Sequence, residues 1–142
     1  MYRHILISTD GSELAEHGVA QGVALAKSLG AKVSVIFVLE PLSELGARYR
    51  EVLAGYAAIR KEQATSALDG AARAAREAGV SCETIQAESG QPHHAIIAAA
   101  KDKGCDLIVM SSHGRSGLSA VLIGSVTNKV LTRAKTPVLV CQ

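Results

Sequence analysis

Hydrophobic and polar positions divide the chain into two kinds of segment that alternate along it. Short apolar runs, typical of strands covered on both faces, predict five strands, at 4–9, 32–39, 80–88, 106–111 and 136–141. Apolar residues that recur every three or four positions predict four helices, at 13–29, 43–78, 93–103 and 125–134. The third strand is the most polar, so we expect it near a sheet edge. The pattern is weakest over 43–60, and we expect an irregular start to the second helix there.

Single residues mark the expected ends of the helices. Ser12 follows an Asp-Gly turn and is a plausible N-cap, and Pro92 suits the first position of a helix. Gly30, Gly79 and Gly104 each stand directly after a helical pattern, where a left-handed glycine commonly ends a helix.

The alternation of strands and helices predicts an α/β fold. Right-handed crossovers lead to a doubly wound, five-stranded parallel sheet with helices on both faces and strand order 3-2-1-4-5. We expect one domain over residues 1–142. In such sheets ligands bind beyond the carboxyl ends of the strands, where the winding reverses. The loops at 9–12, 38–41 and 112–123 should meet there.

Composition narrows the classes of function. Hydrophobic residues make up 48% of the chain and aromatic residues only 3%, so we expect an aliphatic core. The net charge of +2, from 15 basic and 13 acidic residues, leaves no basic surface that would suggest a nucleic-acid or membrane partner. No signal-peptide pattern or membrane-length apolar run is present, so we expect a cytoplasmic protein. Cys82, Cys105 and Cys141 are expected to be reduced thiols, because no C-x-x-C pattern occurs.

The segment 111–125 carries the main candidate chemistry. It reads Ser-Ser-His-Gly-Arg-Ser-Gly and, six residues later, Gly-Ser, between an apolar strand and a helix. The first turn of a helix offers unpaired N–H groups and a partial positive charge, and glycines allow a phosphate to approach the backbone closely. The connection is also longer than the usual two to six or so residues of a βα loop. We therefore expect a phosphate site, with a simple turn and helix cap as the alternative.

Individual residues of this segment have expected roles. Gly124 and Ser125 would supply backbone N–H groups, and Ser125 a hydroxyl as well, while Gly114 and Gly117 would wrap the phosphates. Arg115 either pairs with a phosphate or stays in solvent. His113 either contacts phosphate, carries a proton or is simply solvated.

Other polar residues have weaker claims to a site. Asp10 either closes the turn through its own backbone or accepts from a ribose hydroxyl or an adenine amine. His93 and His94 are adjacent on a helix and point in different directions, so we expect no metal site. The basic residues near the end of the last helix should complement its dipole; they are Lys129, Arg133 and Lys135.

Several linked motifs resemble the universal stress protein family along nearly the whole chain. Residues 5–12 (Ile-Leu-Ile-Ser-Thr-Asp-Gly-Ser) look like its opening strand and turn, and Gly90-Gln91-Pro92 is similar to its G-x-P turn. Residues 111–125, followed by Pro-Val-Leu-Val at 137–140, look like its phosphate loop and closing strand. The resemblance implies a Rossmann-like fold of the adenine nucleotide alpha hydrolase type and a homodimer through strand 137–141.

The nucleotide-binding branch of that family carries G-x-x-G, nine residues, then G-[S/T]. Gly114, Gly124 and Ser125 match this pattern, but Ser111 stands where the first glycine belongs. A serine there supplies the same backbone groups if its φ is negative; a positive φ would be strained, and a Cβ atom lying against the ribose would also be costly. The resemblance implies a site for ATP or AMP, with Mg²⁺ held through the phosphates. Its residues would be Thr9, Asp10, Gly11, Ser12, Val38, Met110, Ser111, Ser112, His113, Gly114, Arg115, Gly117, Gly124, Ser125 and Val126.

The sequence favours binding over catalysis. It lacks the P-loop, G-x-G-x-x-G and G-x-S-x-G patterns, and the loop offers no convincing base, clamp and metal-holding carboxylates for phosphoryl transfer. The leading hypothesis is a dimeric, adenine-nucleotide-binding regulator of the stress response with an unknown protein partner. A nucleotide-free interaction module, for which Ser111 is the main support, and a slow ATPase are the alternatives.

Overall fold

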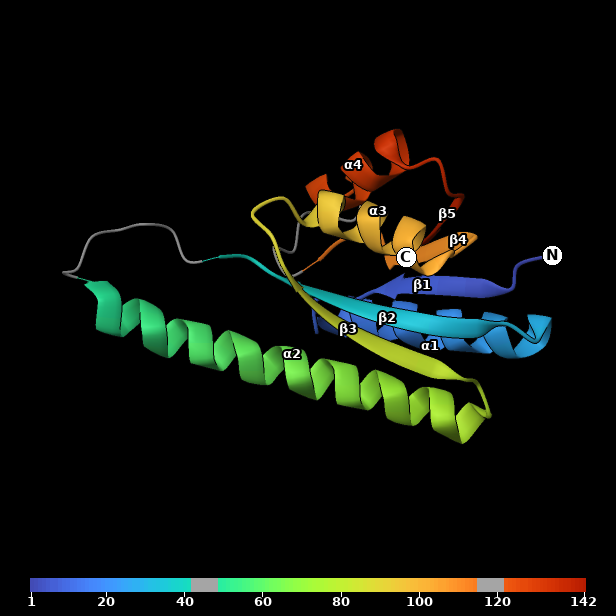
Figure 1. Cartoon of the computed structure of the whole chain (residues 1–142), viewed down its shortest axis with the longest axis horizontal. Coiled ribbons are helices and arrows are strands. Elements are labelled where there is room, and N and C mark those ends of the chain that lie inside the picture. The colour runs from blue at the N-terminus through green and yellow to red at the C-terminus, as the bar shows by residue number, and fades with distance from the viewer. Residues whose placement is uncertain (42–48, 115–121) are drawn as a thin grey trace.

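A computed structural model describes residues 1–41, 49–114 and 122–142 of the chain (Figure 1). Its described strands form one parallel five-stranded sheet in the order β3-β2-β1-β4-β5, as the sequence predicts. The strands are β1 (His4–Ser8), β2 (Lys32–Leu39), β3 (Cys82–Glu88), β4 (Leu107–Ser111) and β5 (Val138–Cys141). The helices are α1 (Glu13–Leu29), α2 (Arg50–Ala78), α3 (Pro92–Lys103) and α4 (Ser125–Arg133).

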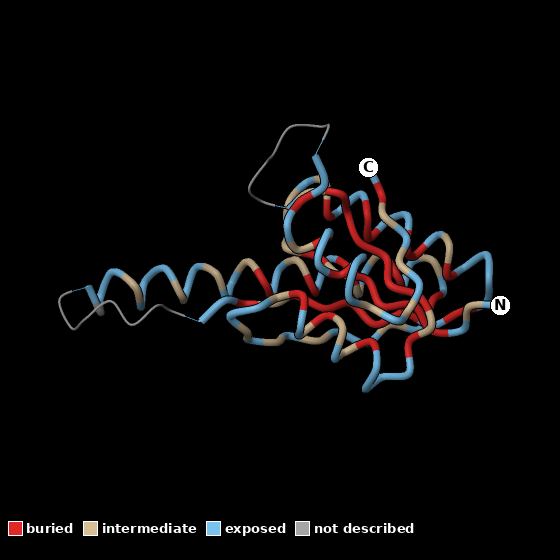
Figure 2. Tube along the Cα trace, turned by 90° about the horizontal axis from the view of Figure 1, so that it is seen from above, coloured by how far each residue is buried: buried red, intermediate tan, exposed pale blue. Residues whose placement is uncertain are grey.

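The helices cover both faces of the sheet. α1 and α2 lie on one face and α3 and α4 on the other, so the sheet is doubly wound (Figure 1). Alternate residues of a strand point to opposite faces. In β1, Ile5 and Ile7 join the core beneath α1 and α2, whereas Leu6 joins the core beneath α3 and α4. Figure 2 shows that burial is concentrated along the strands between these layers.

Local residues end the helices where the sequence predicts. The Ser12 hydroxyl accepts a hydrogen bond from the Ala15 amide at 3.2 Å and caps α1. Gly30, Gly79 and Gly104 adopt φ values of 66°, 75° and 69° and end α1, α2 and α3.

The second helix, predicted over 43–78, is described over only part of that range. In the described residues α2 begins at Arg50, and 43–48 lie outside the described residues. The N-terminal part of α2 extends past the end of the sheet (Figure 1). Val52, Tyr56 and Ile59 of this helix are exposed.

The two edges of the sheet differ in polarity. β3 exposes Glu83 and Thr84, as expected for a polar edge strand, whereas the edge strand β5 exposes Leu139. The three cysteines are unpaired, and burial raises the pKa of the Cys105 thiol to about 11. A thiol with so high a pKa holds almost no reactive thiolate at neutral pH. No helix in the described ranges is long and apolar enough to cross a membrane.

Candidate functional site

The candidate residues gather at the carboxyl edge of the sheet, where the winding reverses between β1 and β4. These two strands pair in parallel, with Ile7 opposite Val109, so the segments that follow them leave the sheet side by side. β2 lies on the other side of β1, with Ile36 opposite Ser8. The end of β2, the turn after β1 and the loop after β4 therefore share one edge, as the sequence predicts.

The turn after β1 is held by its own side chains. The Thr9 amide donates to the Ile36 carbonyl at 3.0 Å and extends the pairing with β2. The Gly11 amide donates to the Thr9 hydroxyl at 3.1 Å, and the Ser12 amide donates to Asp10 Oδ1 at 2.9 Å. The turn-forming role expected for Asp10 is confirmed, and its contact with a nucleoside stays a prediction.

The Asp10 carboxylate also lies against the loop after β4. A Cβ atom placed on Gly114 would be only 2.5 Å from Asp10 Oδ2. Gly114 has no positive φ, so its need for glycine comes from this close approach and not from an unusual backbone conformation. The turn after β1 and the loop after β4 thus contact each other directly.

The carbonyl groups of three consecutive loop residues each accept a hydrogen bond. The Thr127 hydroxyl donates to the Ser111 carbonyl at 2.8 Å, and the Gly124 amide donates to the Ser112 carbonyl at 2.7 Å. The Ser111 hydroxyl donates to the His113 carbonyl at 2.8 Å. The loop is therefore tied to the start of α4 and to its own first residue.

The start of α4 supplies the expected N–H groups. Gly124 stands at the N-cap with φ −58° and ψ 154° and makes no side-chain cap. The first hydrogen bond of the helix runs from the Asn128 amide to the Gly124 carbonyl at 2.9 Å. Among the described residues, no acceptor is seen for the amides of Ser125, Val126 and Thr127. These three groups form the positive end of the helix dipole.

Close packing holds the two halves of the loop together at Gly124. A Cβ atom on this residue would lie 3.2 Å from the Ser112 carbonyl oxygen and 3.5 Å from the His113 Cα atom. Gly124 is buried, so a Cβ atom would push the backbone of segment 112–114 by a few tenths of an ångström, and a larger side chain would push it further.

His113 has one ring nitrogen without a partner. Its Nδ1 atom lies 3.0 Å from the Ser112 hydroxyl, while Nε2 is buried and finds no hydrogen-bond partner in the described structure. A buried polar atom of this kind calls for an explanation, such as a ligand oxygen.

The backbone of Val38 faces the same region. Peptide groups along a parallel strand point alternately to its two neighbours. Val33 and Leu39 bond to the β3 side, whereas Ile36 accepts from Thr9 on the β1 side. Val38 therefore turns its N–H and C=O towards the β1 side, beyond the last residue of that strand.

The structure brings most of the predicted site residues together but not all of them. Met110 is buried in the core beneath α3 and α4, and half-buried Val126 packs against that core, so their side chains face away from solvent. Arg115 and Gly117 lie outside the described residues. The residues gathered at this edge are Thr9, Asp10, Gly11, Ser12, Val38, Ser111, Ser112, His113, Gly114, Gly124, Ser125 and, through its backbone amide alone, Val126.

Sequence reasoning missed two side-chain contacts of α4, one of which supports this edge. Thr127 is buried and bonds to Ser111, and only its place in the first turn of the last helix could have suggested that role. Arg133 was expected only to complement the helix dipole, yet its Nη1 atom lies 3.0 Å from His93 Nε2. Burial above all, then the positive neighbours His94 and Arg133, lowers the pKa of His93 and favours the neutral ring that can accept this bond.

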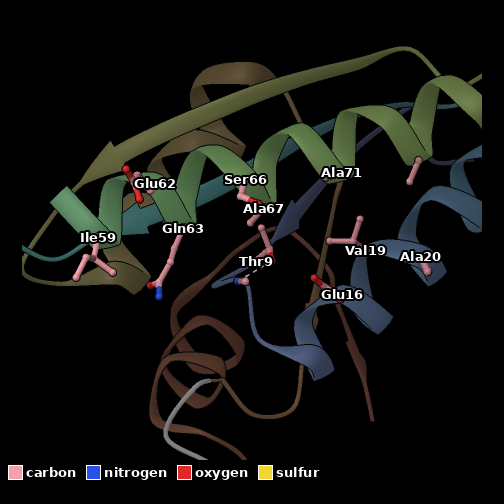
Figure 3. A pocket seen from close by; sticks show the side chains of 13 residues that line it. Thr9, Glu16, Val19, Ala20, Ile59, Glu62, Gln63, Ser66, Ala67 and Ala71 are labelled. Atoms are coloured by element: carbon pink, nitrogen blue, oxygen red, sulfur yellow. Dashed lines mark hydrogen bonds between the residues drawn. The ribbon is translucent and has the colours of Figure 1, made fainter. Parts of the chain in front are cut away.

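A separate hollow of about 710 Å³ lies between α1 and α2, on the other face of the sheet from α4 (Figure 3). It reaches Thr9 and Gly11 at one end, so it adjoins the candidate site. Its lining includes the carboxylates of Glu16 and Glu62. Negative side chains disfavour a phosphate, which points to the α4 side of the edge as the anion site.

The doubly wound parallel sheet, with backbone amides gathered at its switch point, defines an α/β protein of the class whose ligand sites lie at that edge. The model of the universal stress protein family matches residues 1–142. The chain belongs to this family.

Individual relatives agree with this assignment. Universal stress protein MJ0531 of Methanocaldococcus jannaschii is 34% identical over 140 residues, which cover 99% of this chain and 82% of that protein. Universal stress protein YxiE of Bacillus subtilis is 34% identical over 147 residues, covering 99% of both chains. The crystal structure of a universal stress protein in complex with cAMP superposes with a TM-score of 0.75 at 26% identity, covering 99% of this chain and 96% of that one.

Proposed function

We propose that this chain is an adenine-nucleotide-binding regulatory protein of the stress response. The observation that carries the proposal is the contact between Gly124 and Ser112, which joins the β4 loop to the start of α4 and sets their free amides at one edge. Such a cluster suits a phosphate group. A family member of similar structure, in complex with cAMP, supports an adenine nucleotide as the ligand.

The two ends of the ligand are assigned by charge. The phosphates would lie against the amides of Ser125, Val126 and Gly114, with Mg²⁺ accompanying ATP through its phosphates. The nucleoside would lie towards β2, where the Val38 backbone can pair with adenine. Asp10, whose Oδ2 atom lies close to Gly114 where the two ends of the ligand would meet, is assigned to the nucleoside, as the family resemblance implies.

The backbone conformation of the serine that interrupts the family's glycine pattern is compatible with this site. No non-glycine residue in the described ranges has a positive φ, and Ser111 is the last residue of β4. The backbone strain that would have favoured a nucleotide-free interaction module is therefore not found at this position.

Calorimetric titration tests the proposal. We expect wild-type protein to bind Mg-ATP or AMP. The Gly124→Val variant should lose at least roughly ten-fold in affinity, about 1.4 kcal/mol, because its side chain would displace segment 112–114. Gly70→Ala is the matched control, since a Cβ atom there meets nothing within 4 Å. Absence of binding to wild-type protein at millimolar nucleotide would refute the proposal.

We also propose that the protein acts as a homodimer through β5. β5 is the last strand on one side of the sheet. Leu139 is 43% exposed there, between the half-buried Val138 and Val140. An apolar strand edge of this kind pairs readily with a second strand. Nucleotide binding near the end of β4, the strand paired with β5, could then be transmitted to the dimer and to a regulatory partner.

A further inference from the structure

The hydroxyl of Ser111 makes a hydrogen bond that a glycine at this position could not make. Ser111 is the last residue of β4 and is only 7% exposed. Its Oγ atom donates to the carbonyl of His113, two residues further along the loop, at 2.8 Å. Its own carbonyl accepts a buried hydrogen bond from the Thr127 hydroxyl at 2.8 Å, so both the side chain and the carbonyl group of Ser111 are held in place.

This bond sets the direction of the next amide. In a trans peptide the C=O of one residue and the N–H of the next point in opposite directions, and the described residues contain no cis peptide. The His113 carbonyl points inward to the Ser111 hydroxyl, so the Gly114 N–H points away from the strand. The Ser112 carbonyl points to the Gly124 amide, so the His113 N–H is turned away from Gly124.

We propose that Ser111 is a positioning residue of the phosphate site, whose hydroxyl holds the His113–Gly114 peptide so that the Gly114 amide faces the anion. The proposal deepens the nucleotide-binding function proposed above and rests on it. Its consequence runs against the family pattern: replacing Ser111 with the glycine of that pattern should weaken the binding of phosphates. Glycine would remove the donor to the His113 carbonyl and loosen the strand end.

Calorimetry with two ligands separates this role from a general loss of structure. Ser111→Ala removes only the hydroxyl, and Ser111→Gly also removes the Cβ atom. Both should bind Mg-ATP roughly five-fold more weakly than wild-type protein, the effect of one neutral hydrogen bond, while their affinity for adenosine stays unchanged. Ser28→Ala is the matched control, because its Oγ atom donates to the Ala24 carbonyl at 3.1 Å near the far end of α1.

A second readout needs no nucleotide. The ¹⁵N order parameter of the Gly114 amide in the free protein should fall in both Ser111 variants and stay at its wild-type value in Ser28→Ala. Unchanged or tighter Mg-ATP binding by Ser111→Gly would overturn the proposal, as would an equal loss of adenosine and Mg-ATP. If wild-type protein binds neither ligand, the proposed function fails, and an unchanged order parameter in Ser111→Gly would separately refute the anchoring role.

Discussion

At the scale of single residues, hydroxyl groups fix the backbone of the candidate site. Ser111 and Thr127 each donate to a loop carbonyl, and Ser112 lies beside the ring of His113. Thr127 is the most deeply buried of these residues and bridges α4 to the end of β4. An unpaired buried carbonyl is costly, so these small polar groups matter more than their size suggests.

Thr127→Val tests that bridge, because valine keeps the shape of threonine and removes its donor. We expect the free energy of unfolding to fall by about 1–3 kcal/mol, the cost of an unsatisfied buried carbonyl, without a change in the urea m-value. Thr132→Val is the control: its exposed hydroxyl bonds only within α4, to the Asn128 carbonyl, and the change should stay within about 0.5 kcal/mol. Equal losses in the two variants would contradict the assigned role.

Gly114→Ala tests the close approach between the two turns. The new Cβ atom would lie 2.5 Å from Asp10 Oδ2, so the loop must move away from the turn after β1. We expect Mg-ATP affinity to fall by roughly ten-fold, about 1.4 kcal/mol, in a calorimetric titration. Gly90→Ala should have no effect, because the nearest atom to its Cβ would be Pro41 Cγ at 4.0 Å. Wild-type affinity in Gly114→Ala would exclude this segment from the site.

A buried histidine at the amino end of β1, the end of the strand away from the candidate site, predicts a pH dependence of stability. His4 Nε2 lies 2.7 Å from the Ser34 hydroxyl, and burial, then the charge of Lys32, lowers the pKa of His4 below its ordinary 6.5. Between the lowered pKa of His4 in the folded protein and 6.5, its value in the unfolded chain, the unfolded chain binds more protons than the folded one. The free energy of unfolding therefore rises with pH across this window. Stability should fall on acidification from pH 6.5 towards the lowered pKa.

Urea unfolding at several pH values measures this slope. His4→Gln should reduce it, whereas the exposed His17→Gln should leave it unchanged. His93, whose pKa is also lowered, contributes with the same sign and accounts for a remaining slope. A slope that is the same in His4→Gln and wild-type protein would show that His4 does not titrate as its burial implies.

At the scale of helices and strands, two helical glycines differ in their packing role: Gly22 lets α1 pack closely on the sheet, whereas Gly70 of α2 makes no close contact. Gly22 of α1 faces the sheet, and a Cβ atom there would lie 2.6 Å from Ile7 Cδ1. Ile7 is fully buried and cannot easily move aside. Gly70 of α2 has nothing within 4 Å of its Cβ position.

These two glycines should therefore respond oppositely to alanine. Gly22→Ala should lower the free energy of unfolding by about 1–3 kcal/mol, because overpacking outweighs the gain in helix propensity. Gly70→Ala should raise it by about 0.5–1 kcal/mol, because only the propensity changes. Thermal or urea unfolding of both variants gives the comparison, and a stabilised Gly22→Ala would contradict the described packing of α1.

The sequence predicts elements better than it predicts the contacts between them. Both ends of α1 are confirmed, because a serine cap and a left-handed glycine act locally. The bonds from Ser111 and Thr127 could not be predicted, since they depend on where the loop and α4 meet in space. The predicted start of the second helix near residue 43 lies outside the described residues and stays a prediction; the apolar pattern is weak there, and the described N-terminal part of α2 extends past the sheet.

At the scale of the whole molecule, the two edges of the sheet predict how copies associate. β5 presents the exposed Leu139, whereas β3 presents charged and polar side chains such as Glu83. Charged residues discourage strand pairing, so β5 is the edge expected to meet a second chain.

Leu139→Lys should therefore convert a dimer into a folded monomer, since lysine on an edge strand opposes pairing. Light scattering coupled to size exclusion measures the mass, and circular dichroism confirms that the fold is kept. Leu131→Lys, at an exposed leucine of α4, is the control and should leave the dimer intact. A wild-type monomer, or a dimer that persists in Leu139→Lys, would refute pairing through β5.

An NMR titration of ¹⁵N-labelled protein with Mg-ATP shows whether a phosphate binds at the start of α4, because it observes the backbone amides themselves. We expect the amide signals of Gly114, Ser125 and Val126 to shift most, together with that of Val38 at the nucleoside end. Signals that do not move at millimolar Mg-ATP, or shifts confined to the hollow between α1 and α2, would contradict phosphate binding at the start of α4.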